Sequence, residues 1–529
     1  MDSLVVRDPY PFETWIAYRT SGGGSGTASD PWDGSSAAKF DLIMGSLPSN
    51  VPVTVHLGPT PVGSPFQTNG YYVGAGSTYG WRARANMKII GSGVDTTVLQ
   101  VTNVTQAAHY YAIAHDLNSA TKLDYMEISD LTIDCGLPTG TSTAACGAIR
   151  IFGDHCKIRR VKAISWGTKG TVPCYVFSII AALPDSGIIE TVDSGIDECI
   201  AILPGSTSGP TTAFHIGSQE DINQTNEGFA KSPYIRNCFV DCGVTTPSPS
   251  GNFHGLSMGW CRGGVVEGNQ VYNADAAGPY QDKRSARDIV VRNNFYKNTA
   301  IGIYWNLGYL GASSSGYLSR NGSVLTVVIG NIQGLAVGDR IKLVTAPSSF
   351  SGVYVIKTID QQAGQFTATT PVTSDSTANI STAQKVLSLS RAIVEGNIVE
   401  LIPGVSGVKG IWVDDNNATN PYAEAPDYVH GDIFIRNNKT RYVDGSPPTG
   451  TSDIAIQANG AKNLQISNNI IDTANATPLQ NQRCGSVKYF NNLAPNGALI
   501  QGYNPDILNK YSEPATDAED AFVLAFMNT

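Results

Sequence analysis

The chain has 529 residues, with 35 basic and 44 acidic side chains and a formal net charge of −9. This balance offers no basic patch, which excludes a nucleic-acid-binding role. No run of about 18 apolar residues exists, so the sequence contains no membrane span. The low share of charged residues, 15%, together with 55 Gly, 28 Pro and 23 Tyr, is typical of β structure.

The nine cysteines form no C-x-x-C pair and no Cys/His cluster with the spacing of a zinc site. We therefore expect most of them to act as small apolar residues in the core. One or two disulfides stay open, with Cys238–Cys242 and Cys135–Cys146 as the nearest candidate pairs.

Helical patterns occur near both ends of the chain. Residues 30–58 predict an Asp/Ser-capped amphipathic helix followed by a first strand, and residues 517–529 predict a second amphipathic helix. Helices at these places would cover the two open ends of a long β structure, whose unpaired edges otherwise invite aggregation.

A short phrase recurs through the second half of the chain. It reads YIRNCFV, VVEGNQV, IVVRNNFY, AIVEGNIV, IFIRNNKT, LQISNNII and VKYFNNLA, and its aligned positions are Cys238, Asn269, Asn294, Asn397, Asn438, Asn469 and Asn492. All but one of the spacings are those of a single structural repeat, which predicts a solenoid of stacked strands. We expect the Asn side chains to form a hydrogen-bonded ladder along the stack.

The position two residues before most of these Asn residues carries charges of alternating sign. The residues are Arg236, Glu267, Arg292, Glu395 and Arg436. Neighbouring strands of a solvated sheet prefer opposite charges side by side, so we interpret these residues as a structural ion-pair ladder without a catalytic role.

The one long spacing between repeats contains an insertion. Residues 317–385 predict a small module of short alternating strands, inserted between two coils. The expected organisation is 1–316 for the N-terminal cap and the first coils, 317–385 for the module, and 386–529 for the remaining coils and the C-terminal helix. An inserted module on one face commonly borders a binding site, and the alternative is a spacer that points away.

A second short strand follows each Asn phrase, and stacking aligns the ends of these strands in a column. Acids and aromatic residues gather there, as in GIWVDDNN (410–417), although an Asp-Asp pair is also ordinary turn chemistry. The candidate catalytic acids are Glu220, Asp282, Asp414 and Asp415, and the candidate binding residues are His254, Trp260, Tyr280, Lys283, Tyr304, Trp305 and Trp412. His215 is expected to be a core residue. Aromatic faces stack on sugar rings and paired carboxylates cleave glycosidic bonds, so the column predicts a carbohydrate site.

The repeats resemble the right-handed parallel β-helix of the pectin-lyase-like superfamily over about residues 50–505. This resemblance implies an all-β solenoid and a carbohydrate-active or tailspike-like protein. The Asp414–Asp415 pair and His254 match parts of polygalacturonase motifs, while WVDD (412–415) is similar to a pectate-lyase phrase. No subfamily pattern is complete. The resemblance also implies a secreted, periplasmic or cell-surface protein, although residues 1–15 show no signal peptide.

Three functions remain open on the sequence. The first is hydrolysis of a poly- or oligosaccharide by two carboxylates, without a cofactor. The second is β-elimination by a polysaccharide lyase, with Ca²⁺ beside a uronate and Lys283 or Arg284 as base. The column is poor in Lys and Arg, which favours hydrolysis of a neutral or weakly charged glycan. The third is a non-catalytic glycan-binding spike or adhesin, and a homo-oligomer stays open.

Overall fold

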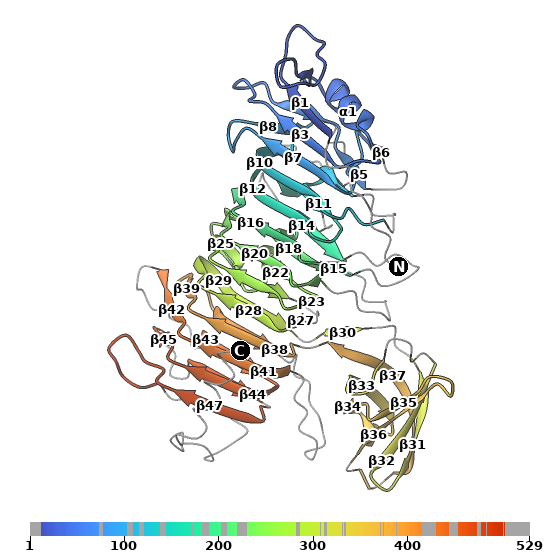
Figure 1. The fold of residues 1–529 in the computed structure, drawn as a ribbon. Helices are drawn as coiled ribbons and strands as arrows, with labels where there is room; N and C mark the ends of the chain where they lie inside the picture. Colours follow the sequence, from blue (N-terminus) through green and yellow to red (C-terminus); the bar gives the residue numbers. More distant parts are fainter. Residues whose placement is uncertain are drawn as a thin grey trace, which may run out of the picture.

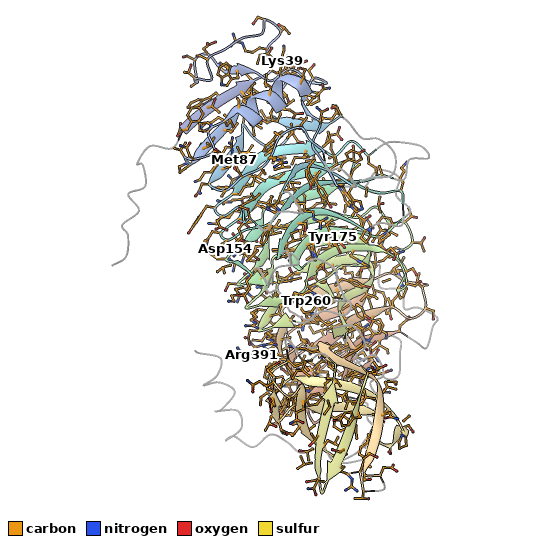
Figure 2. The ribbon with its side chains drawn as sticks, turned by 90° about the vertical axis from the view of Figure 1, so that its right-hand side faces the viewer. Lys39, Met87, Asp154, Tyr175, Trp260 and Arg391 are labelled. Carbon is orange, nitrogen blue, oxygen red and sulfur yellow. The ribbon has the colours of Figure 1, made fainter. Side chains whose placement is uncertain are left out.

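The protein is a parallel β-helix, as the sequence predicted (Figure 1). A computed structural model describes residues 12–502, except 74–77, 103–108, 116–120, 138–143, 171–172, 182–189, 203–208, 219–229, 282–285, 307, 311–314, 331, 333–334, 371, 374, 388, 415–429, 444–452, 473–477, 483 and 501. The chain descends the stack in order, as Lys39, Met87, Trp260 and Arg391 show in Figure 2. None of the helices in these ranges is long and apolar enough to cross a membrane.

Each coil contributes strands to three faces. The first face contains the strands of the Asn phrase: β3 (Val53–Leu57), β7 (Met87–Gly91), the starts of β10 (Glu127–Asp134) and β12 (Lys157–Ile164), β16 (Gly195–Asp197), β20 (Tyr234–Arg236), β24 (Val265–Glu267), β28 (Ile289–Arg292), β38 (Arg391–Glu395), β41 (His430–Arg436), β44 (Ala461–Ser467) and β47 (Ser486–Phe490). These strands pair in parallel in the order of the chain.

The second face follows directly after the Asn turn. It contains β4 (Phe66–Thr68), β8 (Val98–Val101), the ends of β10 and β12, β17 (Ile200–Ile202), β21 (Phe239–Asp241), the starts of β25 (Gln270–Ala276) and β29 (Phe295–Asn306), β39 (Ile398–Leu401), β42 (Lys439–Tyr442) and β45 (Ile470–Ile471).

The third face completes each coil. It contains β9 (His109–Ala114), β11 (Ala145–Ile151), β14 (Cys174–Ala181), β18 (Thr211–Ser218), β22 (Phe253–Met258), β26 (Tyr280–Gln281), the end of β29, β40 (Lys409–Asp414), β43 (Ile454–Asn459) and β46 (Leu479–Gln482). Four two-residue strands lead from it back to the first face: β15 (Thr191–Val192), β19 (Ala230–Lys231), β23 (Cys261–Arg262) and β27 (Ala286–Arg287). Short β5 (Tyr71–Val73), β6 (Thr78–Tyr79) and β13 (Gly167–Thr168) pair at its margin.

The predicted N-terminal cap is confirmed. Helix α1 (Ala37–Ser46) begins after Ser36, whose side chain accepts a hydrogen bond from the backbone N–H of Lys39. Phe40 and Met44 of this helix are buried on the first coil, where β1 (Phe12–Ala17) and β2 (Trp32–Asp33) also pair. The predicted C-terminal helix at 517–529 lies outside the described residues.

The Asn ladder is confirmed at the turn between the first and second faces. From Asn269 to Asn492, each side-chain amide nitrogen donates to the amide oxygen of the next Asn along the stack, at 2.9–3.1 Å. The same oxygen also accepts a backbone N–H of the coil before, as Asn397 does from Asn294 at 3.1 Å. The ladder therefore satisfies polar groups that are buried between coils.

In two earlier coils a cysteine takes the place of Asn at this turn, at Cys199 and Cys238, and all nine cysteines are buried and free. Cys238 stands at the Asn position, and the backbone N–H that it carries donates to Asn269 at 3.0 Å. Neither of the two disulfides left open by the sequence forms, and the expectation of core cysteines is confirmed. Burial raises the pKa of Cys135 and Cys238 well above the ordinary value, so both remain thiols.

The charge ladder of the first face is also confirmed. Arg292 donates to Glu267 at 2.8 Å and Arg436 donates to Glu395 at 2.8 Å, and Arg236 lies 3.9 Å from Glu267. These side chains are partly exposed, so each pair contributes little to stability, and the arginines are committed to partners.

The inserted module is an eight-stranded antiparallel sheet with its own apolar core, beside the C-terminal coils in Figure 1. It contains β30 (Gly308–Leu310), β31 (Gly316–Asn321), β32 (Val324–Ile329), β33 (Arg340–Ala346), the 3-10 helix η1 (Ser348–Phe350), β34 (Gly352–Val355), β35 (Thr358–Asp360), β36 (Gln365–Thr369) and β37 (Thr377–Leu387). Since β30 pairs with the end of β37, the sheet reaches beyond the range 317–385 on both sides.

We predict that Asn397→Ala lowers the free energy of unfolding by about 3 kcal/mol, because it leaves the buried backbone N–H of Asn294 without an acceptor and interrupts the ladder. Urea unfolding followed by circular dichroism measures the effect. The control is Asn463→Ala on the exposed side of β44, where the expected change is below about 0.5 kcal/mol. Equal midpoints for the two variants would contradict a stabilising role of the ladder.

Candidate functional site

The strands of the third face share a side-chain pattern that departs from simple alternation. In the middle of each strand, a small residue and a large apolar residue both point into the core, and the residues on either side of the pair point outward. The inward pairs include Ala148–Ile149, Ala213–Phe214, Gly255–Leu256, Gly302–Ile303, Gly410–Ile411 and Ala455–Ile456. At Gly302, a Cβ atom would lie 2.3 Å from the carbonyl oxygen of Gly410 on the next coil. The small residue therefore permits close approach of neighbouring coils.

The residue directly after each inward pair forms an outward column along the third face. The strand register aligns Ala114, Arg150, Ser178, His215 and Ser257 in the N-terminal coils, and Tyr280, Tyr304, Trp412, Gln457 and Gln480 in the C-terminal coils. We call this set the outward column. Its C-terminal part contains three of the residues that the sequence proposed for substrate binding.

Four rings stack side by side on this face. The ring centroids of His254 and Tyr280 are 3.7 Å apart, those of Tyr280 and Tyr304 are 5.2 Å apart, and those of Tyr304 and Trp412 are 4.5 Å apart. Tyr304 is buried between its neighbours, at 8% exposure, while the other three rings are partly exposed. We call these four residues the ring column, and they offer a continuous aromatic surface that crosses several coils.

Lys409, which the sequence analysis did not single out, lies over the Trp412 ring at one end of the ring column. The Nζ atom of Lys409 lies 3.4 Å from the centroid of the Trp412 ring and donates to Oε1 of Gln457 at 2.6 Å. Burial lowers the pKa of Lys409 to about 8, and the nearby Asp414 carboxylate opposes that shift. Lys409 and Trp412 stand directly before and after the inward Gly410–Ile411 pair. The sequence pattern of a small residue followed by a large apolar residue would therefore have predicted that Lys409 points outward.

Asp414 is the one candidate acid that the structure describes. It ends β40 on the outward side, where it pairs in register with Asn306, and its side chain is partly buried. Its backbone carbonyl accepts a hydrogen bond from Nε2 of the buried His430 at 3.0 Å, because Nδ1 of His430 accepts the backbone N–H of Leu389. The imidazole therefore fixes the end of the strand that carries Asp414. Glu220, Asp282, Lys283 and Asp415 lie outside the described residues.

Two candidate binding residues have different positions from those expected. Trp305 points into the core and is 1% exposed, because Ile303 and Trp305 face inward while Tyr304 and Asn306 face outward. Its predicted role in stacking on a ligand is therefore wrong. Trp260 is also buried, in the turn between β22 and β23, where its carbonyl accepts the backbone N–H of Ala230. It does not belong to the ring column.

His215 also differs from its expected place. It is 1% exposed, but it belongs to the outward column, since Phe214 and Ile216 occupy the core. Its ring packs on Tyr175 at 4.4 Å between centroids, and its Nδ1 lies 3.2 Å from the Ser257 hydroxyl. Polar and aromatic side chains therefore continue along the outward side of the third face toward the N-terminal coils.

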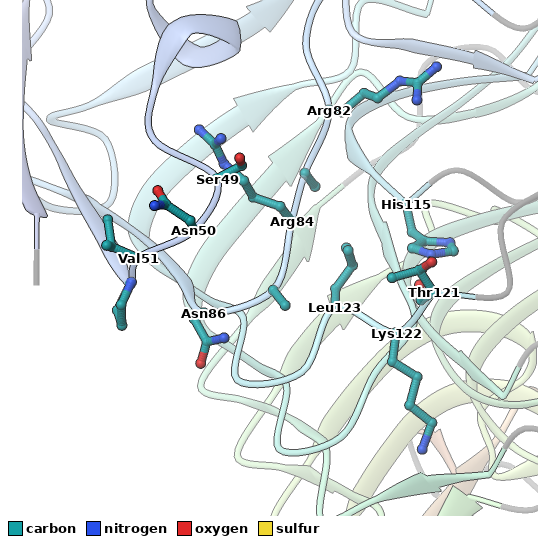
Figure 3. Close-up of a pocket in the computed structure, with 13 residues that line it drawn as sticks. Ser49, Asn50, Val51, Arg82, Arg84, Asn86, His115, Thr121, Lys122 and Leu123 are labelled. Carbon is teal, nitrogen blue, oxygen red and sulfur yellow. The ribbon is translucent and has the colours of Figure 1, made fainter. Parts of the chain in front are cut away.

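A separate basic cavity of about 410 Å³ lies near the N-terminal cap (Figure 3). Its described lining includes Arg82, Arg84, His115 and Lys122 and contains no carboxylate. The cations of this lining have partners within the protein. Arg84 donates to the carbonyls of Leu47 and Met44 at the end of α1, and Lys122 makes an ion pair with Asp154 at 2.8 Å. Elsewhere, the described residues show no group of three or more His, Cys, Asp or Glu side chains that could hold a metal ion.

We predict that the stability difference between the protein and its Lys409→Met variant depends on pH. Because the pKa of Lys409 falls from 10.5 to about 8 on folding, the unfolded chain holds more protons between these values, and stability rises with pH across this window. The variant lacks this contribution. Its advantage in urea midpoint should therefore be largest below about pH 8 and shrink toward about pH 10. A difference that stays constant with pH, as expected for the exposed control Lys462→Met, would count against a buried amine.

No family model matches the chain, and no curated protein matches it. Among solved structures, it is similar to a mutant tailspike protein of E. coli bacteriophage HK620 in complex with a pentasaccharide, at 12% identity and a TM-score of 0.41, over 85% of this chain and 62% of that one. It is also similar to the A-modules of the Azotobacter vinelandii mannuronan C-5 epimerases AlgE6 and AlgE4, at 11% and 12% identity and TM-scores of 0.35 and 0.32. These matches cover 88% and 93% of this chain and 90% and 98% of those chains. The likeness is one of fold.

Proposed function

We propose that the third face binds a poly- or oligosaccharide chain along the ring column and cleaves it at the end that carries Asp414. The observation that carries this proposal is the continuous stack of His254, Tyr280, Tyr304 and Trp412. Aromatic faces offer a large apolar contact to sugar rings, and edge polar groups such as the Tyr hydroxyls can bind sugar hydroxyls. A stack that crosses several coils fits an extended chain of sugars better than a single small molecule.

Hydrolysis requires two carboxyl groups, one that protonates the leaving oxygen and one that activates water or forms a covalent intermediate. Asp414 supplies one carboxylate at the end of the ring column. The second would come from Asp282, Asp415 or Glu220, the other candidate acids of the sequence analysis. No cofactor is needed for this reaction.

One observation favours a second candidate, β-elimination on a uronate-containing glycan. With a pKa near 8, Lys409 is partly a neutral amine around neutral pH. Such an amine could remove the proton next to a uronate carboxylate, after which the glycosidic oxygen leaves and a double bond forms in the sugar. The uronate carboxylate would then need a cation such as Ca²⁺ beside it. A spike that only binds glycans is the third candidate.

We predict that Trp412→Ala weakens glycan binding by at least about tenfold, because it removes the partly exposed ring at one end of the column. A polysaccharide panel identifies the ligand, and calorimetry then gives the dissociation constants. The control is Trp32→Ala, an exposed tryptophan in the N-terminal cap, and this variant should bind as the unchanged protein does. If both variants bind with unchanged affinity, the ligand does not use the ring column.

We predict that two further variants, Asp414→Asn and Lys409→Met, distinguish hydrolysis from β-elimination. If the protein is a hydrolase, Asp414→Asn lowers turnover by at least about a hundredfold and Lys409→Met has a smaller effect. If it is a lyase, Lys409→Met shows the larger loss and the product absorbs ultraviolet light, because elimination leaves an unsaturated sugar. Reducing ends and absorbance are measured in the same digest. If the protein binds the glycan but produces no new reducing ends, the third candidate, a spike that only binds glycans, is supported.

A further inference from the structure

Arg150 of β11 is a buried cation that has no counter-charge among the described residues. It is 7% exposed, and it makes no ion pair with a carboxylate of the described residues. Its Nε atom has no hydrogen-bond partner. Its guanidinium carbon lies 5.7 Å from the centroid of the Tyr111 ring, on the outward side of the third face. Buried charges are normally paired, because removal from water costs several kcal/mol per ion.

The described titratable groups that interact with Arg150 do not supply a negative charge at neutral pH. Burial lowers the pKa of His109 to about 4, and the Arg150 charge adds to this shift, so His109 is neutral. Burial raises the pKa of Tyr111 to about 12 and that of Cys174 to about 12. The phenol and the thiol therefore keep their protons. Among the described residues, the guanidinium faces neutral groups in a largely desolvated surrounding, in which an incoming anion would be bound strongly.

Arg150 lies in line with the proposed glycan site. It belongs to the outward column, and Ser178, His215 and Ser257 follow it on successive coils. Strands lie about 4.8 Å apart, so three steps separate Arg150 from Ser257 by about 14 Å. The rings of Tyr175 and His215 lie along this path, and His254, beside Ser257, begins the ring column. One extended chain of sugars could contact both regions.

We propose that Arg150 binds the carboxylate of an acidic sugar, so that the glycan bound by the third face is a uronic-acid-type polymer. A guanidinium presents two parallel N–H donors that match a planar carboxylate. This inference rests on the proposed glycan-binding function and adds its substrate class. It also revises the expectation of a neutral glycan, which rested on the scarcity of Lys and Arg, since both Arg150 and Lys409 face outward on these coils.

The test compares the thermal unfolding of the full chain in the presence of single sugars. The probes are D-glucuronate, D-galacturonate and D-mannuronate, with D-glucuronamide as the uncharged isostere and sodium chloride at matched ionic strength. We expect a saturable rise in Tm with at least one uronate and none with the amide or the salt. A rise that the amide or the salt reproduces would overturn the proposal, as would the absence of a rise with all three uronates.

Variants then assign the response to Arg150. In Arg150→Met the uronate-dependent rise should disappear, while Tm without ligand stays equal or increases, because an uncompensated buried charge is removed. In Arg150→Lys, which keeps the charge but loses the planar fork, the dissociation constant should increase by at least about tenfold. The control Arg391→Met removes a surface arginine that pairs with Asp288, and it should keep the full response. An unchanged response in both Arg150 variants contradicts the assignment.

Polymer binding by the Trp412→Ala variant tests the proposed glycan site independently of the proposed role of Arg150. If Trp412→Ala abolishes polymer binding but neutral and acidic polymers bind the unchanged protein equally, the glycan site stands and the role of Arg150 falls. If Trp412→Ala has no effect while the Arg150-dependent response to uronate persists, the carboxylate site stands and the extended glycan site falls.

Discussion

The register between coils is the constraint on which the other features depend. Every coil must return to the same place so that its strands pair with those above and below at about 4.8 Å. At the turn between the first and second faces, one residue adopts a left-handed conformation in each of ten successive coils: Asp130, Arg160, Glu198, Asn237, Gly268, Asn293, Gly396, Asn437, Asn468 and Asn491. Asn and Gly tolerate this conformation best, and they hold it in the C-terminal coils. There the following Asn residue lies on the ladder and satisfies the backbone of the neighbouring coil.

The same register aligns the outward residues of the third face. Because the pair of a small and a large inward residue recurs at the same place in each strand, the residue that follows the pair falls on one line. The ring column is thus a consequence of coil geometry together with the choice of Tyr280, Tyr304 and Trp412 at three adjacent positions. A shift of one residue in a single coil would turn its ring into the core and interrupt the surface.

Sequence reasoning predicted the fold and the first face, because the Asn phrase carries its own signal of period and turn. Both ladders followed from that phrase. The third face was only partly predictable. Grouping the strand ends into one column counted Trp305 as outward, although it faces the core as Ile303 does. Simple alternation fails where two consecutive residues face inward, so Lys409, before the Gly410–Ile411 pair, was left out. Arg150 of β11 could not be singled out from the sequence. Its proposed role depends on the neutral side chains that pack around it in the fold.

The charged residues of the first and third faces differ in whether they have carboxylate partners among the described residues. On the first face, arginines such as Arg292 and Arg436 have carboxylate partners in register, and the arrangement is complete within the protein. On the third face, neither Arg150, which is buried, nor Lys409, which is partly buried, makes an ion pair with a described carboxylate. A fold selected for stability alone would pair or replace such cations. If the third face binds an acidic glycan, as proposed, the ligand would supply part of the charge balance that the described residues leave open.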